Sequence, residues 1–314
     1  MTRAHLNRLA TDPLQAWEIL DKVLAFHDEP VQAMSAVIGF ELMGLAASKG
    51  VKVVLNGQGA DEVIGGYSSY FRDYWSTLVR QGRLRETWTE IGDFSSHHGG
   101  SKTALFLDTL RHFSKLALSR AASYRRLARW KYRRDGDRHP WFANDVAAHL
   151  EDGFPEPEDW SLDAILRRSV ERGPLPLYLR LEDRNSMAHS LECRLPFMDY
   201  RLVSLVFKCA ADWKLRGRWN KYLLREAMRG RIPESVRTRV TKWGFPVPQW
   251  NWISGAWHEL IQALLASGEM RERGLYDLPA IRRDLERHRQ GHVDLTGAFF
   301  RLVQFELWAR RLSP

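Results

Sequence analysis

The sequence has few cysteines and no long hydrophobic run. Its two cysteines, Cys193 and Cys209, are too few to form a disulfide framework in a chain of 314 residues. No stretch approaches the roughly 18 uninterrupted apolar residues that a membrane-spanning helix needs, so a transmembrane protein is excluded. The first residues also lack the apolar run of a secretory signal peptide. We therefore expect a cytoplasmic protein with reduced thiols and no membrane partner.

Positive charge is concentrated in one segment. Residues 111–138 contain ten Lys or Arg and two Asp, an excess of eight out of a total net charge of +9. Tyr124, Leu127, Ala128 and Lys131 recur at helical spacing, which predicts a basic amphipathic helix resting on a thin apolar stripe. A solvated helical connector is the simpler interpretation, and an RNA-binding or anionic-surface role is the alternative. Because no recognised nucleic-acid motif is present, we do not expect nucleic acid as a partner.

Hydrophobic periodicity predicts an α/β layer in the first part of the chain. Apolar residues between Val31 and Ser48 recur at intervals of three and four, which indicates an amphipathic helix. The β-branched stretch Val51–Leu55 then predicts a strand buried on both faces of a parallel sheet. The loop that follows, Asn56–Glu62, lies where open α/β sheets bind their ligands.

The later part of the chain is mainly helical. Before it, the acidic, proline-rich stretch Glu151–Asp159 indicates an exposed connection. Periodicity and punctuation predict four helices, at Asp163–Arg172, Leu177–Leu191, Asp199–Ala210 and Lys221–Arg229.

The loop Asn56–Glu62 is the first candidate site. Its glycines, Gly57 and Gly59, let backbone N–H groups approach a ligand, as in loops that bind phosphate. Asp61 and Glu62 add carboxylates that could hold Mg²⁺ against phosphate oxygens. A tight strand-to-helix turn without any ligand explains the same spacing, so both interpretations stay open.

A second candidate is the charged helix around residues 180–194. Opposed charges occur there on an otherwise apolar segment, and they could simply form ion pairs with one another. Alternatively they form a polar wall for a zwitterionic or phosphorylated substrate, with arginines that bind oxygens in pairs. The residues concerned are Arg180, Glu182, Asp183, Arg184, Glu192 and Arg194.

The third candidate is Lys242, in the glycine- and proline-containing stretch Thr241–Pro248. A stiff backbone around a lysine can hold its side chain in a cleft. An ordinary exposed lysine is the simpler interpretation of Lys242 taken by itself.

Together these stretches resemble the synthetase domain of glutamine-dependent asparagine synthetases. The motifs are Val-Val-Leu-x-Gly-Gln-Gly-Ala-Asp-Glu-x-x-Gly-Gly-Tyr, Glu-Asp-Arg-Asn-Ser-Met-Ala-His-Ser-Leu-Glu-x-Arg-x-Pro-Phe-x-Asp, Lys-Tyr-Leu-Leu-Arg and Lys-x-Gly-Phe-Pro-Val-Pro. Asp28-Glu-Pro30 also matches, and the resemblance extends over residues 25–255. It implies an α/β fold: part of an adenine-nucleotide alpha-hydrolase-like (ATP pyrophosphatase) parallel sheet, with a large, mainly helical carboxy-terminal part.

The resemblance also implies three regions and a two-step reaction. Residues 1–75 would form the second half of the pyrophosphatase core, residues 76–160 a basic helical insertion, and residues 161–314 the helical remainder. ATP, with Mg²⁺, would adenylate the carboxylate of aspartate and release pyrophosphate, after which ammonia would displace AMP and leave asparagine. Two alternatives remain: a relative that amidates another carboxylate, as in β-lactam, macrolactam or sugar-acid amide formation, and a non-catalytic remnant.

Residue roles follow from the matched motifs. The nucleotide would be bound by Asn56, Gly57, Gln58 and Gly59, and Mg²⁺ by Asp61. The catalytic residues would be Asp61, Glu62 and Lys242, of which Lys242 neutralises charge that builds on phosphate. Glu62 would also help to orient the carboxylate substrate, which would be bound by Arg180, Glu182, Asp183 and Arg184.

Two family features are missing from the sequence. Position 2 is Thr2 rather than the cysteine that begins a glutaminase domain, and the loop Ser-Gly-Gly-x-Asp-Ser, which supplies further phosphate contacts, does not occur. We therefore expect ammonia from a glutaminase domain that is absent here, and an upstream companion polypeptide or a longer product that completes the site. Gln58 also stands where some members have an acidic residue, which leaves the substrate carboxylate open.

Overall fold

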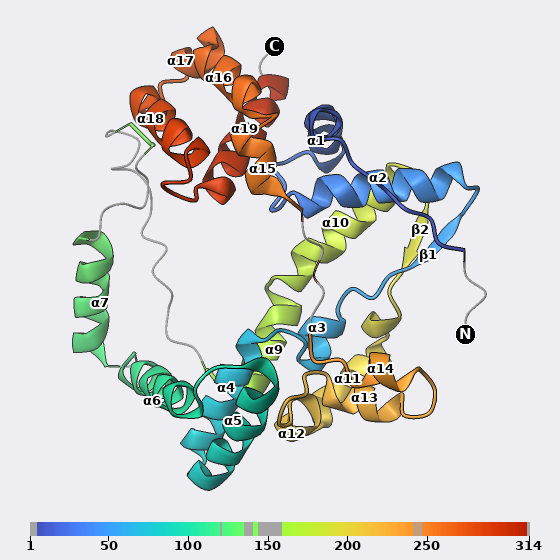
Figure 1. Ribbon diagram of the computed structural model, residues 1–314, viewed down its shortest axis with the longest axis vertical. Helices are drawn as coiled ribbons and strands as arrows, with labels where there is room; N and C mark the ends of the chain where they lie inside the picture. The colour runs from blue at the N-terminus through green and yellow to red at the C-terminus, as the bar shows by residue number, and fades with distance from the viewer. Residues whose placement is uncertain are drawn as a thin grey trace.

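Helices dominate the architecture, and a small parallel sheet lies toward one side of it (Figure 1). The computed structural model describes residues 5–119, 121–134, 141–143, 159–241, 244 and 247–312. Within these residues no helix has the length and apolar character needed to cross a membrane. The α/β class expected from the sequence is confirmed at this coarse level.

The predicted helix and strand near the amino end are both present. Helix α1 (Pro13–His27) is capped by Asp12, whose side chain accepts hydrogen bonds from the backbone N–H groups of Leu14 and Gln15. Helix α2 (Ser35–Ser48) starts a turn later than its apolar periodicity suggested. It leads through Lys49 and Gly50 into strand β1 (Val53–Leu55).

The sheet joins segments that are far apart in the sequence. Strand β1 pairs in parallel with β2 (Glu192–Arg194), which follows helix α10 (Leu175–Met187), and Val54 lies opposite Cys193. The hydrogen-bond ladder continues into the candidate loop, because the Asn56 amide donates to the carbonyl of Arg194 over 2.9 Å. Strands β1 and β2 therefore both end beside the loop Asn56–Glu62. Helix α10 runs through the middle of the molecule (Figure 1).

The prediction that the strand is buried on both faces is wrong. Val53 is 40% exposed and Leu55 is 75% exposed. Within the described residues the sheet has only β1 and β2, so β1 has one paired edge and its apolar side chains are not enclosed as they would be inside a wide parallel sheet. The apolar sequence of β1 is thus that of a buried strand, whereas its surroundings are those of an edge strand.

Three helices form a compact group beside the short helix α3 (Ala60–Ile64). They are α4 (Ser69–Arg80), α5 (Leu84–His98) and α6 (Lys102–Leu118), and they pack around buried Tyr74, Leu78 and Ile91.

Helix α7 (Ala122–Arg134) forms where a basic amphipathic helix was predicted, and it lies at the edge of the molecule (Figure 1). Leu127 belongs to the predicted apolar stripe, but no neighbouring element covers it among the described residues, and it is 61% exposed. The side chains of Ala128 and Lys131 lie outside the described part.

The remaining elements confirm the helical character predicted for the later chain, with shifted ends. They are α9 (Leu162–Glu171), η1 (Pro196–Met198), α11 (Tyr200–Lys208), α12 (Ala211–Lys214), α13 (Tyr222–Ala227), α14 (Glu234–Arg237), α15 (Gln249–Ser254), α16 (His258–Ala266), α17 (Gly268–Glu272), α18 (Leu278–Arg289) and α19 (Thr296–Leu312). The acidic connection predicted at Glu151–Asp159 lies, apart from Asp159, outside the described residues.

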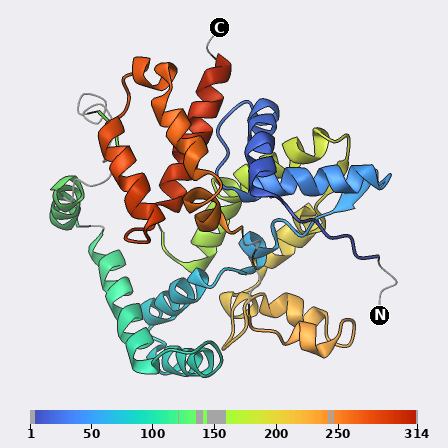
Figure 2. The same cartoon turned by 45° about the horizontal axis from the view of Figure 1, so that its top comes forward.

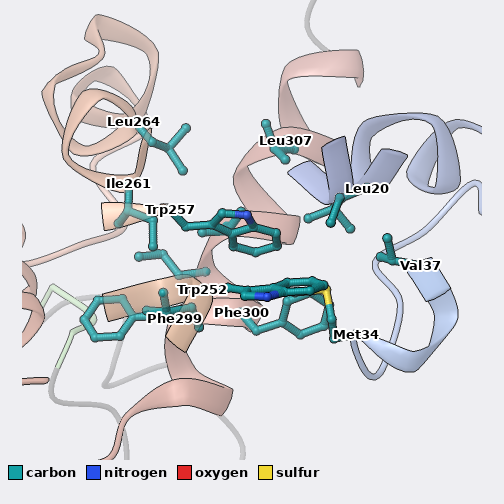
Figure 3. Packing of buried hydrophobic residues seen from close by; sticks show 14 of the residues in the cluster. Leu20, Met34, Val37, Trp252, Trp257, Ile261, Leu264, Phe299, Phe300 and Leu307 are labelled. Carbon is teal, nitrogen blue, oxygen red and sulfur yellow. The ribbon is translucent and has the colours of Figure 1, made fainter. Parts of the chain in front are cut away.

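The largest hydrophobic core brings the first helices against the last ones. Leu20 and Met34 from the amino end pack in one cluster with Trp257, Phe300 and Leu307 (Figure 3). Figure 2 shows the same contact between the blue and the orange-red helices from a second direction. The division at residues 75 and 160 stays a prediction, although this core joins the first and third of those regions.

Candidate functional site

The loop after β1 has the tight backbone that its glycines suggest. The Gln58 amide donates to the Asn56 side-chain oxygen over 3.1 Å, which turns the chain sharply at the end of the strand. Gly59 has a φ of 90°, and a Cβ there would lie 2.3 Å from the sulfur of Met198. At Gly57, by contrast, an added Cβ would meet no atom within 4 Å, so the backbone there is open to an approaching ligand.

Asp61 is paired with a lysine from much later in the chain. The Nζ atom of Lys221 lies 3.0 Å from Oδ1 of Asp61, and both side chains are about a quarter exposed, at 25% and 27%. The backbone of Gly66 packs directly against them, since a Cβ there would lie 1.7 Å from the Asp61 oxygen and 2.4 Å from Cε of Lys221. The pair is therefore held in one place while remaining accessible from solvent.

Lys221 is the site residue that sequence reasoning did not assign. It has a positive φ of 50° and stands immediately before α13. Its motif, Lys-Tyr-Leu-Leu-Arg, was visible in the sequence, but nothing in the local pattern showed that its side chain reaches the loop after β1.

Glu62 lies below the surface. It is 1% exposed, and the hydroxyl of Tyr67 donates to one of its carboxylate oxygens. The other oxygen is buried and has no hydrogen-bond partner among the described residues. Burial raises the pKa of Tyr67 and also that of Tyr178 on α10, and the carboxylate of Glu62 acts in the same direction on both. Glu62 thus lies buried beneath the site and acts on two tyrosines that stay protonated.

The structure brings Asn56 and Glu182 together. Their side chains are hydrogen-bonded between the end of β1 and helix α10. Burial raises the pKa of Glu182, and the hydrogen bond from Asn56 opposes that rise. The neighbouring Asp183 is exposed. Burial raises the pKa of the Cys193 thiol, and the nearby carboxylates of Glu182 and Asp183 raise it further. Two carboxylates of α10 therefore lie on the side of the sheet.

The two arginines of the same helix have other partners. Arg180 forms an ion pair with Glu29, and Arg184 forms one with Asp28 over 2.9 Å. Arg184 also donates to the carbonyl of Phe26 over 3.2 Å. The charges of α10 are thus divided between two faces, with the acids toward β1 and β2 and the arginines toward the segment after α1. The Asp28-Glu-Pro30 motif supplies the acidic partners.

Lys242 lies outside the described residues, so its position relative to Asp61 stays a prediction. In the described part of the chain, no three His, Cys, Asp or Glu side chains gather closely enough to hold a metal ion by themselves. Asp61 nevertheless fits a magnesium ion that arrives with a nucleotide. Such ions take one or two protein carboxylates and complete their shell with phosphate oxygens and water.

Comparison with known proteins identifies the family. The family model of asparagine synthase matches residues 3–310. The chain belongs to the asparagine synthase family. The family points to a ligase of the asparagine synthetase type.

The similarity to individual asparagine synthase relatives is distant but long. A Mycobacterium tuberculosis protein, provisionally named a glutamine-hydrolysing asparagine synthetase, is 30% identical over 307 residues, which cover 92% of this chain and 44% of that protein. Glutamine-hydrolysing asparagine synthetase 1 of Bacillus subtilis is 23% identical over 322 residues, covering 92% and 45%. An amidase of Gibberella zeae, chry2, is 24% identical over 284 residues, covering 81% and 41%. The chain thus spans less than half the length of these relatives.

Replacing Glu182 by Gln is expected to stabilise the fold at neutral pH. Because the pKa of Glu182 is raised in the folded state, its ionisation opposes folding once the pH exceeds the ordinary value for glutamate. Gln keeps a hydrogen-bonding group for Asn56 and removes that cost. Thermal unfolding should therefore give a higher Tm than the unsubstituted chain at pH 7, with the difference vanishing near about pH 3.5.

The exposed neighbour supplies the control for Glu182. Asp183→Asn removes a carboxylate one residue away without changing a buried group, so its Tm should follow that of the unsubstituted chain at both pH values. A Tm gain for Glu182→Gln that is the same at about pH 3.5 as at pH 7 would show that burial of charge is not its cause.

Proposed function

We propose that this chain provides much of the site for ATP-dependent amidation of aspartate to asparagine, through an acyl-adenylate and with release of pyrophosphate and AMP. The observation that carries the proposal is the Asp61–Lys221 pair, held against Gly66 at the carboxyl end of β1. A carboxylate and an ammonium at one accessible point can bind a magnesium–phosphate group between them. Membership of the asparagine synthase family supports the same chemistry.

The residues of the site would divide the work as follows. Asp61 holds Mg²⁺, while Lys221 turns from Asp61 toward phosphate oxygens and the open backbone at Gly57 approaches the nucleotide. Asn56, Gln58 and Gly59 shape that loop. Lys242 neutralises charge that develops on phosphate, as its motif implies.

The acids on and near α10 suit an amino-acid substrate. Glu182 and Asp183 face the sheet and would attract the ammonium group of aspartate, and buried Glu62 adds negative potential from below. Arg180 and Arg184 would have to break their ion pairs with Glu29 and Asp28 before they could bind substrate oxygens. We therefore propose that their main role is to hold α10 against the segment after α1.

We further propose that polypeptide outside these residues completes the sheet and the phosphate site. The exposed apolar side chains of Val53 and Leu55 support this, because parallel strands are ordinarily covered on both faces. The chain also matches less than half of its relatives' length. In this view residues 1–75 belong to an ATP pyrophosphatase core, residues 76–160 form an insertion, and residues 161–314 complete the helical part.

Amidation of a different carboxylate is the second candidate. Gln58 replaces an acidic residue of some family members, and the similarity to an amidase shows that relatives of this chain are not all asparagine synthetases. A chain that binds nucleotide without catalysis is the third candidate.

Exchange of labelled pyrophosphate into ATP tests the proposal. We expect exchange that depends on Mg²⁺ and aspartate, with the purified chain alone or together with the polypeptide encoded directly upstream. Exchange with another carboxylate but not with aspartate would favour the second candidate. No exchange in either preparation with any carboxylate would overturn the enzymatic proposal.

A further inference from the structure

Lys221 is presented by a short turn, residues 215–221, that links α12 to α13; we refer to it as the Lys221 turn. It begins at Leu215, which is fully buried in the hydrophobic cluster of α4, α5 and α9. Arg216 and Trp219 then exchange backbone hydrogen bonds of 2.8 and 3.0 Å, which closes the turn. The position of the Lys221 side chain therefore depends on what holds this turn.

One end of the Lys221 turn is tied to the candidate site. The Lys221 amide donates to the carbonyl of Gly65 over 3.2 Å, and the Asn220 side chain donates to the carbonyl of Gly66 over 2.7 Å. Arg225 in turn donates to the backbone and the side-chain oxygen of Asn220, over 2.7 and 2.9 Å. These contacts fix the residues next to Asp61.

The other end is held by helix α5, which belongs to the insertion predicted at residues 76–160. The Gly217 amide donates to the carboxylate of Glu90, and the Arg218 amide donates to Asp93 over 3.1 Å. The ring of His98 is hydrogen-bonded to the Arg218 carbonyl over 2.9 Å. Three side chains of α5 thus form hydrogen bonds with the backbone of Gly217 and Arg218.

Glycine is required at the point of contact. Gly217 has a φ of 54°, and a Cβ there would lie 2.1 Å from an oxygen of Asp93. A side chain would therefore be strained and would push the carboxylate away from the backbone amides. The close approach of α5 and the Lys221 turn depends on this residue.

The carboxylate of Glu90 is held at an energetic cost. Burial raises the pKa of Glu90, and the hydrogen bond from Gly217 opposes that rise. Glu86 and Asp93 of the same helix raise the pKa further, whereas Arg216 of the turn lowers it. A partly desolvated carboxylate is tolerated where it accepts N–H groups, and such charge-assisted hydrogen bonds are stronger than neutral ones.

We propose that α5 is a clamp that positions Lys221 for phosphate binding, and that Glu90 and Asp93 are its positioning residues. Neither touches the proposed ligand. Both hold the backbone of Gly217 and Arg218 in place. The position of these residues in turn fixes the positions of Asn220 and Lys221, which follow in the same turn. The inference rests on the proposed function in one respect, that phosphate is the ligand of Lys221. The clamp itself consists of contacts within the chain.

Hydrogen exchange of the full chain tests the clamp without requiring catalysis. In the double variant Glu90→Ala and Asp93→Ala we expect the Gly217 and Arg218 amides to exchange roughly tenfold faster or more, because each loses a hydrogen bond to a charged acceptor. Exchange in α19, on the far side of the molecule, should be unchanged. Glu86→Ala is the matched control, since Glu86 lies on the same helix and pairs with Arg83 instead.

Binding of inorganic pyrophosphate with Mg²⁺, followed by calorimetry, provides the second measurement. The double variant should bind roughly 10-fold more weakly or worse, and the control should bind like the unsubstituted chain. The single variant Glu90→Gln, which keeps an acceptor for Gly217, should recover most of the amide protection and most of the affinity. If the double variant fails to fold, Asp93→Ala alone should still accelerate exchange of the Arg218 amide, which loses its hydrogen bond to Asp93.

Unchanged exchange at Gly217 and Arg218 in the double variant would overturn the clamp. Equal acceleration in Glu86→Ala, or acceleration that extends to α19, would do the same by showing a general loss of stability. If the unsubstituted chain binds no pyrophosphate at any concentration, either alone or together with the upstream polypeptide, the proposed function fails. The exchange measurement still decides whether α5 holds the turn.

Discussion

Asp61→Asn is expected to reduce aspartate-dependent pyrophosphate exchange by roughly 100- to 1,000-fold, the usual cost of removing one preorganised charged group from a reaction centre. Asn is nearly the same size as Asp, so it fits against Gly66 in the same space. It cannot supply the negative charge that would hold both Mg²⁺ and the ammonium of Lys221, which lies 3.0 Å from the present carboxylate. Exchange rates measured over a range of Mg²⁺ concentrations would report the loss.

The control for Asp61 is Asp108→Asn, on the exposed side of α6. It removes the same charge from the chain without changing the site, so its exchange rate should match that of the unsubstituted protein. Circular dichroism and Tm should show that both variants are folded. Full exchange by Asp61→Asn at every Mg²⁺ concentration would contradict the assignment of Asp61 as the metal ligand.

Trp257→Ala is expected to lower the free energy of unfolding by about 3–5 kcal/mol, the range for removing a large aromatic side chain from a core. Trp257 is fully buried where the first and last helices meet (Figure 3). Its ring meets that of Trp17 edge-on at 5.1 Å, and its indole N–H donates to the carbonyl of Pro13 over 2.6 Å. Alanine would leave a cavity and remove the hydrogen bond to Pro13. Urea unfolding followed by circular dichroism would measure the loss.

Trp250→Ala gives the comparison within the same part of the chain. Trp250 is 40% exposed, so its removal leaves little enclosed space and should cost about 1 kcal/mol or less. If the two tryptophan variants unfolded at the same urea concentration, the core between α1 and α15–α19 would not be the main source of stability in this protein.

Local sequence patterns were sufficient for several helices and for the position of the candidate loop, whereas helices such as α1 and α15–α19 were not predicted individually. Amphipathic periodicity predicted α9 and α11 with ends displaced by little, because their apolar faces repeat regularly. The β-branched stretch before Asn56 correctly predicted a strand that delivers the loop at its carboxyl end. Its burial was not predictable, since that depends on how many strands the sheet has, and neighbouring strands come from other parts of a protein.

The partners of the charged residues could not be predicted from spacing. Arg180 and Glu182 are two residues apart on one helix, yet one pairs with Glu29 and the other with Asn56. A helix places such residues on different faces, and only the fold decides what each face meets. For Lys221, the left-handed backbone and the reach to Asp61 both arise from tertiary contacts at its turn.

The contact between α1 and α19 has a consequence for how the protein is made. The apolar face of α1 leaves the ribosome early, but its partners on α19 begin at Thr296, so they follow tens of seconds later at roughly 5–20 residues per second. During that interval α1 can pack against α2 and later α10, but the part of its apolar face that α19 covers stays exposed. Synthesis should therefore depend on chaperones that shield α1 until α19 has been made.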